Sequence, residues 1–218
     1  MNDSYKIVYT GGTGEIIEKK SRFITTIIPI ATEEEALSFI EQMKKKYWDA
    51  SHNCSAYVLG KNNELERCSD DGEPSKTAGR PMLDVLLNEG IHNTCVVVTR
   101  YFGGTLLGTG GLVRAYQSAV KEGLKNCTIL EKHFGKQLKI TTDYTGLGKI
   151  QYIAGTLGLT TLSTEFTDIV ILTLLIPPSL LPSVTKKVQE ATNGKAELEE
   201  LDDVYYGMND NQILIFSV

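Results

Sequence analysis

Glycines and arginines gather in one segment whose composition suits the binding of an anion. Residues 99–116 read TRYFGGTLLGTGGLVRAY, with five glycines and two arginines. The β-branched run 95–98 is typical of a buried strand, and the apolar positions from Leu112 onward recur at helical spacing. The segment is therefore expected to lead from a strand into the start of a helix, where unpaired backbone N–H groups at the positive helix end can hold an anion. The expected anion-binding loop contains Gly103, Gly104, Gly108, Thr109 as the N-cap, and Gly110 and Gly111 in the first turn.

Arginines near two helix starts strengthen this prediction. Arg114 is expected in the first helical turn, where a cation is disfavoured, so a bound anion or a carboxylate should offset its charge. Arg80 precedes another expected helix start, with Pro81 at the first helical position. We expect the two helix starts to converge on one anionic ligand, with contributions from Arg22 and Arg100. RNA phosphate fits the bidentate geometry of arginine, and two neighbouring side chains offer stacking surface for an unpaired base: Tyr101 and Phe102.

Simpler interpretations of the same residues stay open. A glycine-rich turn often serves close packing alone, and Asp70-Asp71-Gly72 is typical of a polar turn. Those acids are also able to neutralise Arg80 or Arg114 without any ligand. His52, Asp70, Asp71 and Glu73 are candidate polar partners in the site, with His52 more typical of a hydrogen-bonded structural residue than of a general base. Cys54 is expected to pack as a small hydrophobe.

Composition and charge restrict the class of protein. The chain has 218 residues, 41% hydrophobic and 22% charged, with a net charge of −5, which argues against a surface that coats nucleic acid broadly. Residues 1–134 carry 16 Lys and Arg against 17 Asp and Glu, and residues 135–218 carry 6 against 10, so an anion site is expected in the first part. Four widely spaced cysteines without a CxxC pair indicate reduced thiols in a cytoplasmic protein and no metal site. No apolar run is long enough to span a bilayer. The nucleotide-binding phosphate loop GxxxxGK[ST] is lacking, which argues against a nucleotide-hydrolysing motor, and no cofactor is expected.

Hydrophobic periodicity predicts an α+β protein of two domains. In the first domain, residues 1–134, we expect a strand pair over 14–30 and a helix capped by Thr32 with a buried stripe containing Phe39 and Met43. Strands over 54–59 and 64–68, a helix that begins at Pro81 and stops at Gly90, and the strand–loop–helix segment above complete this domain. Residues 132–136 are expected to form a linker.

The second domain, residues 135–218, is expected to show the element order β-α-β-β-α-β of a ferredoxin-like fold. The strands are predicted over 137–142, 160–165, 169–176 and 196–205. The helices are predicted over 146–157 and 182–192. Poor alternation leaves the bounds of the last strand open.

Two long motifs of the first domain resemble the YigZ/IMPACT family. They are DDGEPS (70–75) followed by TAGRP (77–81), and RYFGGTLLGTGGLVRAY (100–116). The resemblance covers essentially the whole chain. The sequence differs from the family pattern at Lys76, where the family more often has glycine, and at Asn53, where a second histidine after His52 is frequent. The absence of that second histidine weakens any metal site built on two histidines. Lys76 is nevertheless included among the residues expected to bind the anion.

The resemblance implies a fold and a field of activity. It implies a first domain like the second domain of a small-subunit ribosomal protein, a second domain like the last domain of elongation factor G, and a role in translation control under stress. We therefore expect a cytoplasmic regulator, not firmly tied to any enzymatic reaction, that binds RNA or the ribosome. Two alternatives stay open: an enzyme acting on a phosphorylated small molecule, or a protein-interaction module whose acidic second domain docks a translation-related partner.

Overall fold

The chain folds into two compact units, each with its own hydrophobic core. The computed structural model describes residues 4–210 and 212–218, and the chain divides between Glu131 and Lys132. Mixed helices and sheets in both units agree with the predicted α+β class. Each unit is described below by itself.

A five-stranded antiparallel sheet forms the centre of the first unit. Its strand order is β2-β3-β7-β4-β5, and its strands are β2 (Gly12–Glu18), β3 (Ser21–Pro29), β4 (His52–Leu59), β5 (Leu65–Ser69) and β7 (Thr94–Tyr101). The predicted strand pair near the start of the chain is β2 and β3, which turn through Lys19 and Lys20. Two further strands, β1 (Ser4–Thr10) and β6 (Ile91–His92), pair in parallel with Lys6 opposite Ile91.

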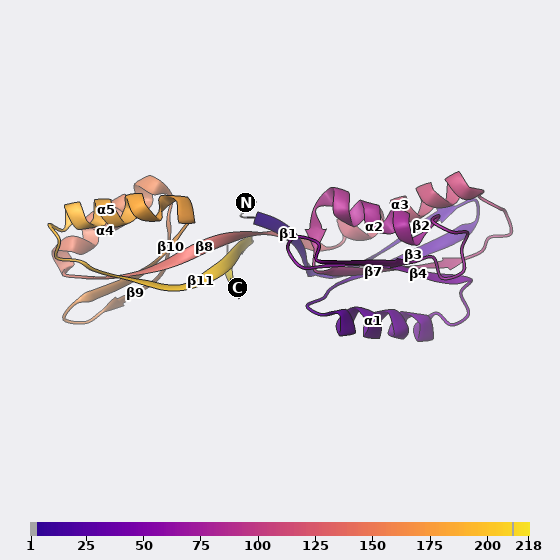
Figure 1. Cartoon of the computed structure of the whole chain (residues 1–218), viewed down its shortest axis with the longest axis horizontal. Coiled ribbons are helices and arrows are strands. Elements are labelled where there is room, and N and C mark those ends of the chain that lie inside the picture. The colour runs from indigo at the N-terminus through magenta and orange to yellow at the C-terminus, as the bar shows by residue number, and fades with distance from the viewer. Residues whose placement is uncertain (1–3, 211) are drawn as a thin grey trace. The chain divides into compact units, whose positions relative to one another are not determined.

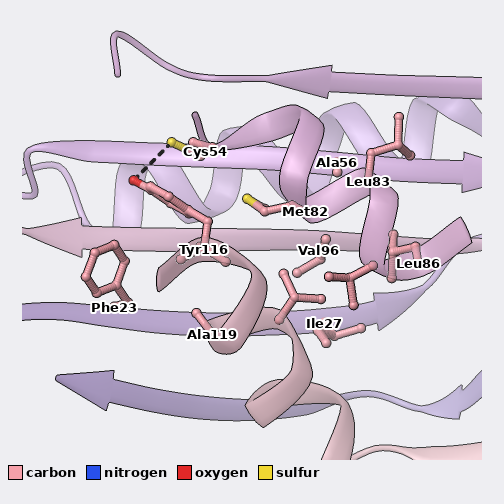
Figure 2. Close-up of a cluster of buried hydrophobic side chains, with 14 of the residues drawn as sticks. Phe23, Ile27, Cys54, Ala56, Met82, Leu83, Leu86, Val96, Tyr116 and Ala119 are labelled. Atoms are coloured by element: carbon pink, nitrogen blue, oxygen red, sulfur yellow. Dashed lines mark hydrogen bonds between the residues drawn. The ribbon is translucent and has the colours of Figure 1, made fainter. Parts of the chain in front are cut away.

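Helices cover both faces of this sheet, which explains the uninterrupted apolar run in β7. Figure 1 shows α1 (Glu33–Lys46) on one face, and α2 (Gly79–Glu89) and α3 (Thr109–Lys125) on the other. Alternate residues of β7 point to opposite faces, so Val97 packs with the α1 side while Val96 and Val98 pack with α2 and α3. The core on the α2 and α3 face surrounds Tyr116, whose ring meets Phe23 edge-on with centroids 5.2 Å apart (Figure 2).

Local signals explain where these helices begin and end. Thr32 caps α1 by accepting a 3.2 Å hydrogen bond from Glu35 N, as predicted. Helix α2 ends at Gly90 in the left-handed conformation, also as predicted, but it begins at Gly79, so Pro81 occupies the third helical position and not the first. Within the described part of the chain, no helix combines the length and apolarity needed to cross a bilayer.

The second unit has the predicted element order β-α-β-β-α-β, followed by one additional strand. Its antiparallel sheet has the order β9-β10-β8-β11-β12, and α4 and α5 pack on it around Leu138, Ile150 and Val184. The elements are β8 (Thr128–Thr142), α4 (Tyr144–Leu157), β9 (Thr160–Phe166), β10 (Val170–Ile176), a 3-10 turn (Pro178–Leu180), α5 (Leu181–Ala191), β11 (Glu197–Asn209) and β12 (Gln212–Ser217).

The predicted linker at residues 132–136 is wrong. These residues lie inside β8 and pair with β11, with Phe134 opposite Tyr205 and Lys136 opposite Asp203. The charged and glycine residues suggested a linker, but the aromatic contact at 5.5 Å and the Lys136–Asp203 ion pair are cross-strand interactions that stabilise a sheet. The sequence interpretation also omitted β1, β6 and β12.

Candidate anion-binding clefts at the start of helix α3

The start of α3 differs from the sequence expectation by one residue, and the difference matters for the site. The N-cap is Gly108, not Thr109, and its φ of 72° favours glycine. No side chain caps this helix, and its first turn holds no acidic residue. The amides of Thr109, Gly110 and Gly111 precede the first helical hydrogen bond, from Leu112 N to Gly108 O at 2.9 Å, and point out of the helix end.

The start of α2 is satisfied within the protein. Asp70 accepts hydrogen bonds from the backbone amides of Lys76 at 2.8 Å, Ala78 at 3.0 Å and Gly79 at 2.8 Å. A carboxylate therefore occupies the position that an anionic ligand would take at this helix end. Arg80 pairs with Asp84 at 2.7 Å and lines neither of the clefts described below. The expected convergence of two open helix starts on one ligand is therefore not found.

One cleft of about 510 Å³ opens beside the uncapped start of α3. We call it the Phe102 cleft. Its walls are mainly apolar, with Phe102, Leu106 and Leu112 among them, and Gly108 and Thr109 bring the helix start to its edge. The loop 69–79 contributes Glu73 and Pro74. Ser51, His52, Arg100 and Leu107 complete the lining.

A second cleft of about 280 Å³ lies on the other side of Leu107, which lines both. We call it the Arg114 cleft, and its charged lining residues are Glu18, Lys19 and Arg114. Arg114 lies in the second helical turn, not the first, and its Nη1 atom is 3.8 Å from where a β-carbon on Gly110 would stand. No ion pair of Arg114 is found among residues 4–210 and 212–218. The guanidinium therefore adds positive charge beside the open amides.

Arg100 is buried and paired inside the protein. Its Nη1 donates to Glu73 Oε1 at 2.6 Å, and its guanidinium lies between the rings of Phe23 and Phe102, 5.4 and 5.7 Å from their centroids. Its Nη2 atom is 3.4 Å from Ser21 Oγ, while its buried Nε has no hydrogen-bond partner among the residues that the structure describes. The Arg100 charge, which the sequence interpretation assigned to a ligand, is thus offset by Glu73.

A hydrogen-bonded network continues from Glu73 into the core. Tyr116 donates its hydroxyl to Glu73 Oε1 at 2.8 Å, and the Cys54 thiol lies 3.3 Å from the Tyr116 oxygen (Figure 2). Burial raises the pKa of both Tyr116 and Cys54 above their ordinary values. Both groups therefore stay neutral, and Cys54 is buried as predicted.

His52 lies at the wall of the Phe102 cleft in a defined orientation. Its Nδ1 atom is 2.9 Å from the carbonyl oxygen of Asp71, which only accepts, so Nδ1 carries the hydrogen in this geometry. Its Nε2 atom is 3.8 Å from Glu73 Oε2. The segment Asp70-Asp71-Gly72 forms the polar turn indicated by the sequence, closed by Glu73 N and Asp70 O at 2.9 Å.

The remaining candidate residues line neither cleft. Some of them form ion pairs or hydrogen bonds elsewhere, and others matter for the backbone conformation of their loops. Arg22 pairs with Glu15 at 2.6 Å, and Tyr101 donates its hydroxyl to Asp49 at 2.8 Å. Lys76 has a φ of 63°, in the region that favours glycine. A β-carbon on Gly103 would stand 2.0 Å from the carbonyl carbon of Lys20, so this glycine serves close packing. Gly104 has a φ of 82° in the same loop.

Sequence analysis missed two residues in this region. Lys19 was seen only as part of a strand turn, and nothing in its spacing relates it to Arg114, 95 positions later in the chain. Trp48 was not singled out, although it stands two positions after the lysine-rich end of the expected helix. Only the fold brings Lys19 beside Arg114 and holds the turn that carries Trp48 against the end of β7.

Comparison with known proteins covers nearly the whole chain. The Impact N-terminal domain matches residues 19–124, and a domain of unknown function, DUF1949, matches residues 140–195. The IMPACT family member YvyE of Bacillus subtilis is 40% identical over 205 residues, 94% of each chain. The member YigZ of Escherichia coli is 33% identical over 187 residues, 85% of this chain and 92% of that one.

One further relative matches part of the chain, and one solved structure matches nearly all of it. Protein IMPACT of Mus musculus is 33% identical over 98 residues, which are 43% of this chain and 30% of the mouse protein. A crystal structure described as that of an hypothetical protein is similar with a TM-score of 0.58 and 31% identity, over 93% of this chain and 99% of that one. The extent and identity of the bacterial matches show that the chain belongs to the IMPACT family.

Proposed function

We propose that this protein is a cytoplasmic, translation-related regulator that binds single-stranded RNA, free or within the ribosome, at the start of α3. The observation that carries the proposal is the uncapped helix start with clefts on both sides. The amides of Thr109, Gly110 and Gly111 have no acidic side chain near them in sequence, whereas Asp70 fills the start of α2. A helix end left open in this way is suited to an anion from outside the protein.

The two clefts match the two parts of a nucleotide. Arg114 and Lys19 would contact a phosphate together with the open amides, while the Phe102 cleft offers apolar walls and an aromatic ring to an unpaired base. Arg100, already neutralised by Glu73, would position Phe102 by cation–π contact. In this arrangement the Arg100–Glu73 pair shapes the site, and Arg114 supplies the free charge.

The translation-related part of the proposal rests on family membership. Eukaryotic relatives include protein IMPACT of Mus musculus. The expected likeness of the first unit to a ribosomal-protein domain, and of the second to the last domain of elongation factor G, fits the same field. We include a translation-related protein partner of the acidic second unit in the proposal. Residues 197–203, which hold five acidic side chains, are suited to such a contact and unsuited to RNA.

One observation favours a second candidate function, an enzyme acting on a phosphorylated small molecule. His52 lines the Phe102 cleft together with the start of α3, and its Nε2 atom lies 3.8 Å from Glu73 Oε2. An imidazole base near an anion-binding helix end is an arrangement that general acid–base catalysis uses. This candidate predicts turnover of a phosphate-bearing metabolite that is lost in His52→Gln.

The salt dependence of RNA binding tests the leading proposal. For single strands, each phosphate contact contributes about 0.7 to the slope of log affinity against log salt. We expect Arg114→Gln to reduce this slope by about 0.7, and Arg114→Gln combined with Lys19→Gln to reduce it by about 1.4. Fluorescence anisotropy of a labelled uridine octanucleotide between low and moderate salt gives the slope.

Arg80→Gln is the matched control. Arg80 is an exposed arginine near a helix start, but its guanidinium is paired with Asp84 and its helix end is capped by Asp70. Its slope should equal that of the unmodified protein. Equal slopes for all variants, or no binding of the octanucleotide, would overturn the proposed site, and metabolite turnover lost in His52→Gln would favour the enzyme instead.

A further inference from the structure

Trp48 is an aromatic side chain in an unusual place. It is the chain's single tryptophan, and it is 82% exposed in the turn that follows α1. Tryptophan is highly buried on average, so a side chain this open is informative about contact with another molecule. No element of the proposed function uses it.

Hydrogen bonds hold the turn that carries Trp48 against the end of β7. Asp49 accepts the Tyr101 hydroxyl at 2.8 Å, and Ser51 N donates to Arg100 O at 2.9 Å. Ser51 Oγ in turn accepts from Phe102 N at 3.3 Å. Because Ser51 and Phe102 both line the Phe102 cleft, the turn from Trp48 leads directly to the wall of that cleft.

Cations and further aromatic rings surround this turn. The last turn of α1 holds three lysines. Lys44 pairs with Asp71 and Lys45 with Glu41, while Lys46 Nζ lies 4.9 Å from the ring centroid of Tyr47. Arg22, which pairs with Glu15, lies opposite Tyr101 in the pairing of β3 with β7. Phe102 is 50% exposed at the cleft itself. Exposed rings interspersed with cations are the combination with which proteins bind single-stranded nucleic acid, because rings stack on bases and cations follow the phosphates.

We propose that Trp48 is a stacking platform for single-stranded RNA that extends the α3 site outward from the Phe102 cleft. The inference rests on the proposed function, since it adds a second base position to the same strand. One base occupies the Phe102 cleft, and a neighbouring base stacks on the Trp48 indole. The cations near Trp48 favour a nucleic acid over an apolar protein surface as its occupant.

The single tryptophan makes a direct test possible. Titration of the full chain with a uridine octanucleotide should quench Trp48 fluorescence, with the same midpoint as the anisotropy of the labelled oligonucleotide. Loss of one base–aromatic stack weakens binding by about tenfold, so Trp48→Ala should show that loss and Trp48→Phe should recover most of it. A uridine–adenosine duplex of the same length should quench little, because its bases are already stacked.

Tyr152→Ala is the matched control. Tyr152 is 76% exposed, but it lies on α4 in the second unit, so its removal should leave the affinity unchanged. If RNA binding depends on Arg114, but Trp48 fluorescence does not change and Trp48→Ala binds as tightly as the unmodified protein, the stacking platform is overturned and the proposed function stands. Absence of any binding by anisotropy would overturn both.

Discussion

At the scale of single residues, the buried ion pair between Arg100 and Glu73 is the central feature of the first unit. Both side chains are almost fully excluded from solvent, and Glu73 accepts from Arg100 and Tyr116 through the same oxygen. Burying two charges is unfavourable unless each is closely paired, and the Phe23 and Phe102 rings add cation–π contact. The pair fixes the floor of the Phe102 cleft without a ligand.

Replacing Glu73 tests this interpretation. In Glu73→Gln the Arg100 charge stays buried without its partner, so the free energy of unfolding should fall by about 3 kcal/mol. Chemical denaturation followed by circular dichroism measures the change, with Glu89→Gln at the exposed end of α2 as control. A Glu73→Gln protein as stable as the control would show that the pair does not hold the cleft.

Asp71 makes stability depend on pH in a defined direction. Burial acts to raise the pKa of this carboxyl, but hydrogen bonds from Lys44 and from Asn53 N outweigh it and hold the pKa below its ordinary value. Because the pKa is lower in the folded state, the ionised Asp71 carboxylate stabilises the fold at pH values above the ordinary pKa of about 3.9. This stabilisation is lost as the pH falls through the folded-state pKa.

We therefore expect Asp71→Asn to remove part of the acid sensitivity of the fold. Asn tolerates the left-handed φ of 44° found at this position, so the turn itself should persist. Free energies of unfolding measured from pH 7 down to pH 3 should converge for Asp71→Asn and the unmodified protein at the acid end. Parallel curves over the whole range would contradict the assignment.

At the scale of elements, α2 and α3 begin in opposite ways. Asp70 accepts hydrogen bonds from three backbone amides at or just before the start of α2, whereas Gly108 leaves α3 without a side-chain cap. Fold stability alone would favour a cap on both helices. The open end of α3 is therefore the place where we propose that an anion from outside the protein binds.

Removal of the α2 cap should be measurable as lost stability. Asp70→Ala leaves three amides without their acceptor, so we expect a loss of about 2 kcal/mol in the free energy of unfolding. Asp84→Ala, which breaks only the exposed pair with Arg80, should cost less than about 0.5 kcal/mol. Equal losses for the two variants would show that Asp70 is not the effective cap.

The sequence predicted elements well where a local signal sets them. Thr32, Gly90 and the apolar stripe of α1 place helix ends and faces through short-range interactions, and these predictions are confirmed. The linker prediction failed because cross-strand pairs such as Phe134–Tyr205 join positions about 70 residues apart in sequence. Likewise, residue types alone did not reveal that Arg100 pairs with Glu73, or that Lys19 lies near Arg114.

At the scale of the whole molecule, each unit forms its own core, and the candidate RNA site lies entirely in the first. Both clefts at α3, the buried ion pair and Trp48 belong to residues 4–131. The acidic excess lies in residues 135–218, with 10 Asp and Glu against 6 Lys and Arg. This division of charge supports RNA contact by the first unit and a different partner for the second.

The most direct test of the central claim observes the backbone amides at the start of α3 while RNA is added. In two-dimensional nitrogen–proton NMR spectra of the full chain, a short uridine oligonucleotide should shift the amides of Thr109, Gly110 and Gly111 most strongly. The amides of Ala78 and Gly79, which donate to Asp70, should hardly move. Shifts centred elsewhere, or equal at both helix starts, would contradict the assignment of α3 as the anion site.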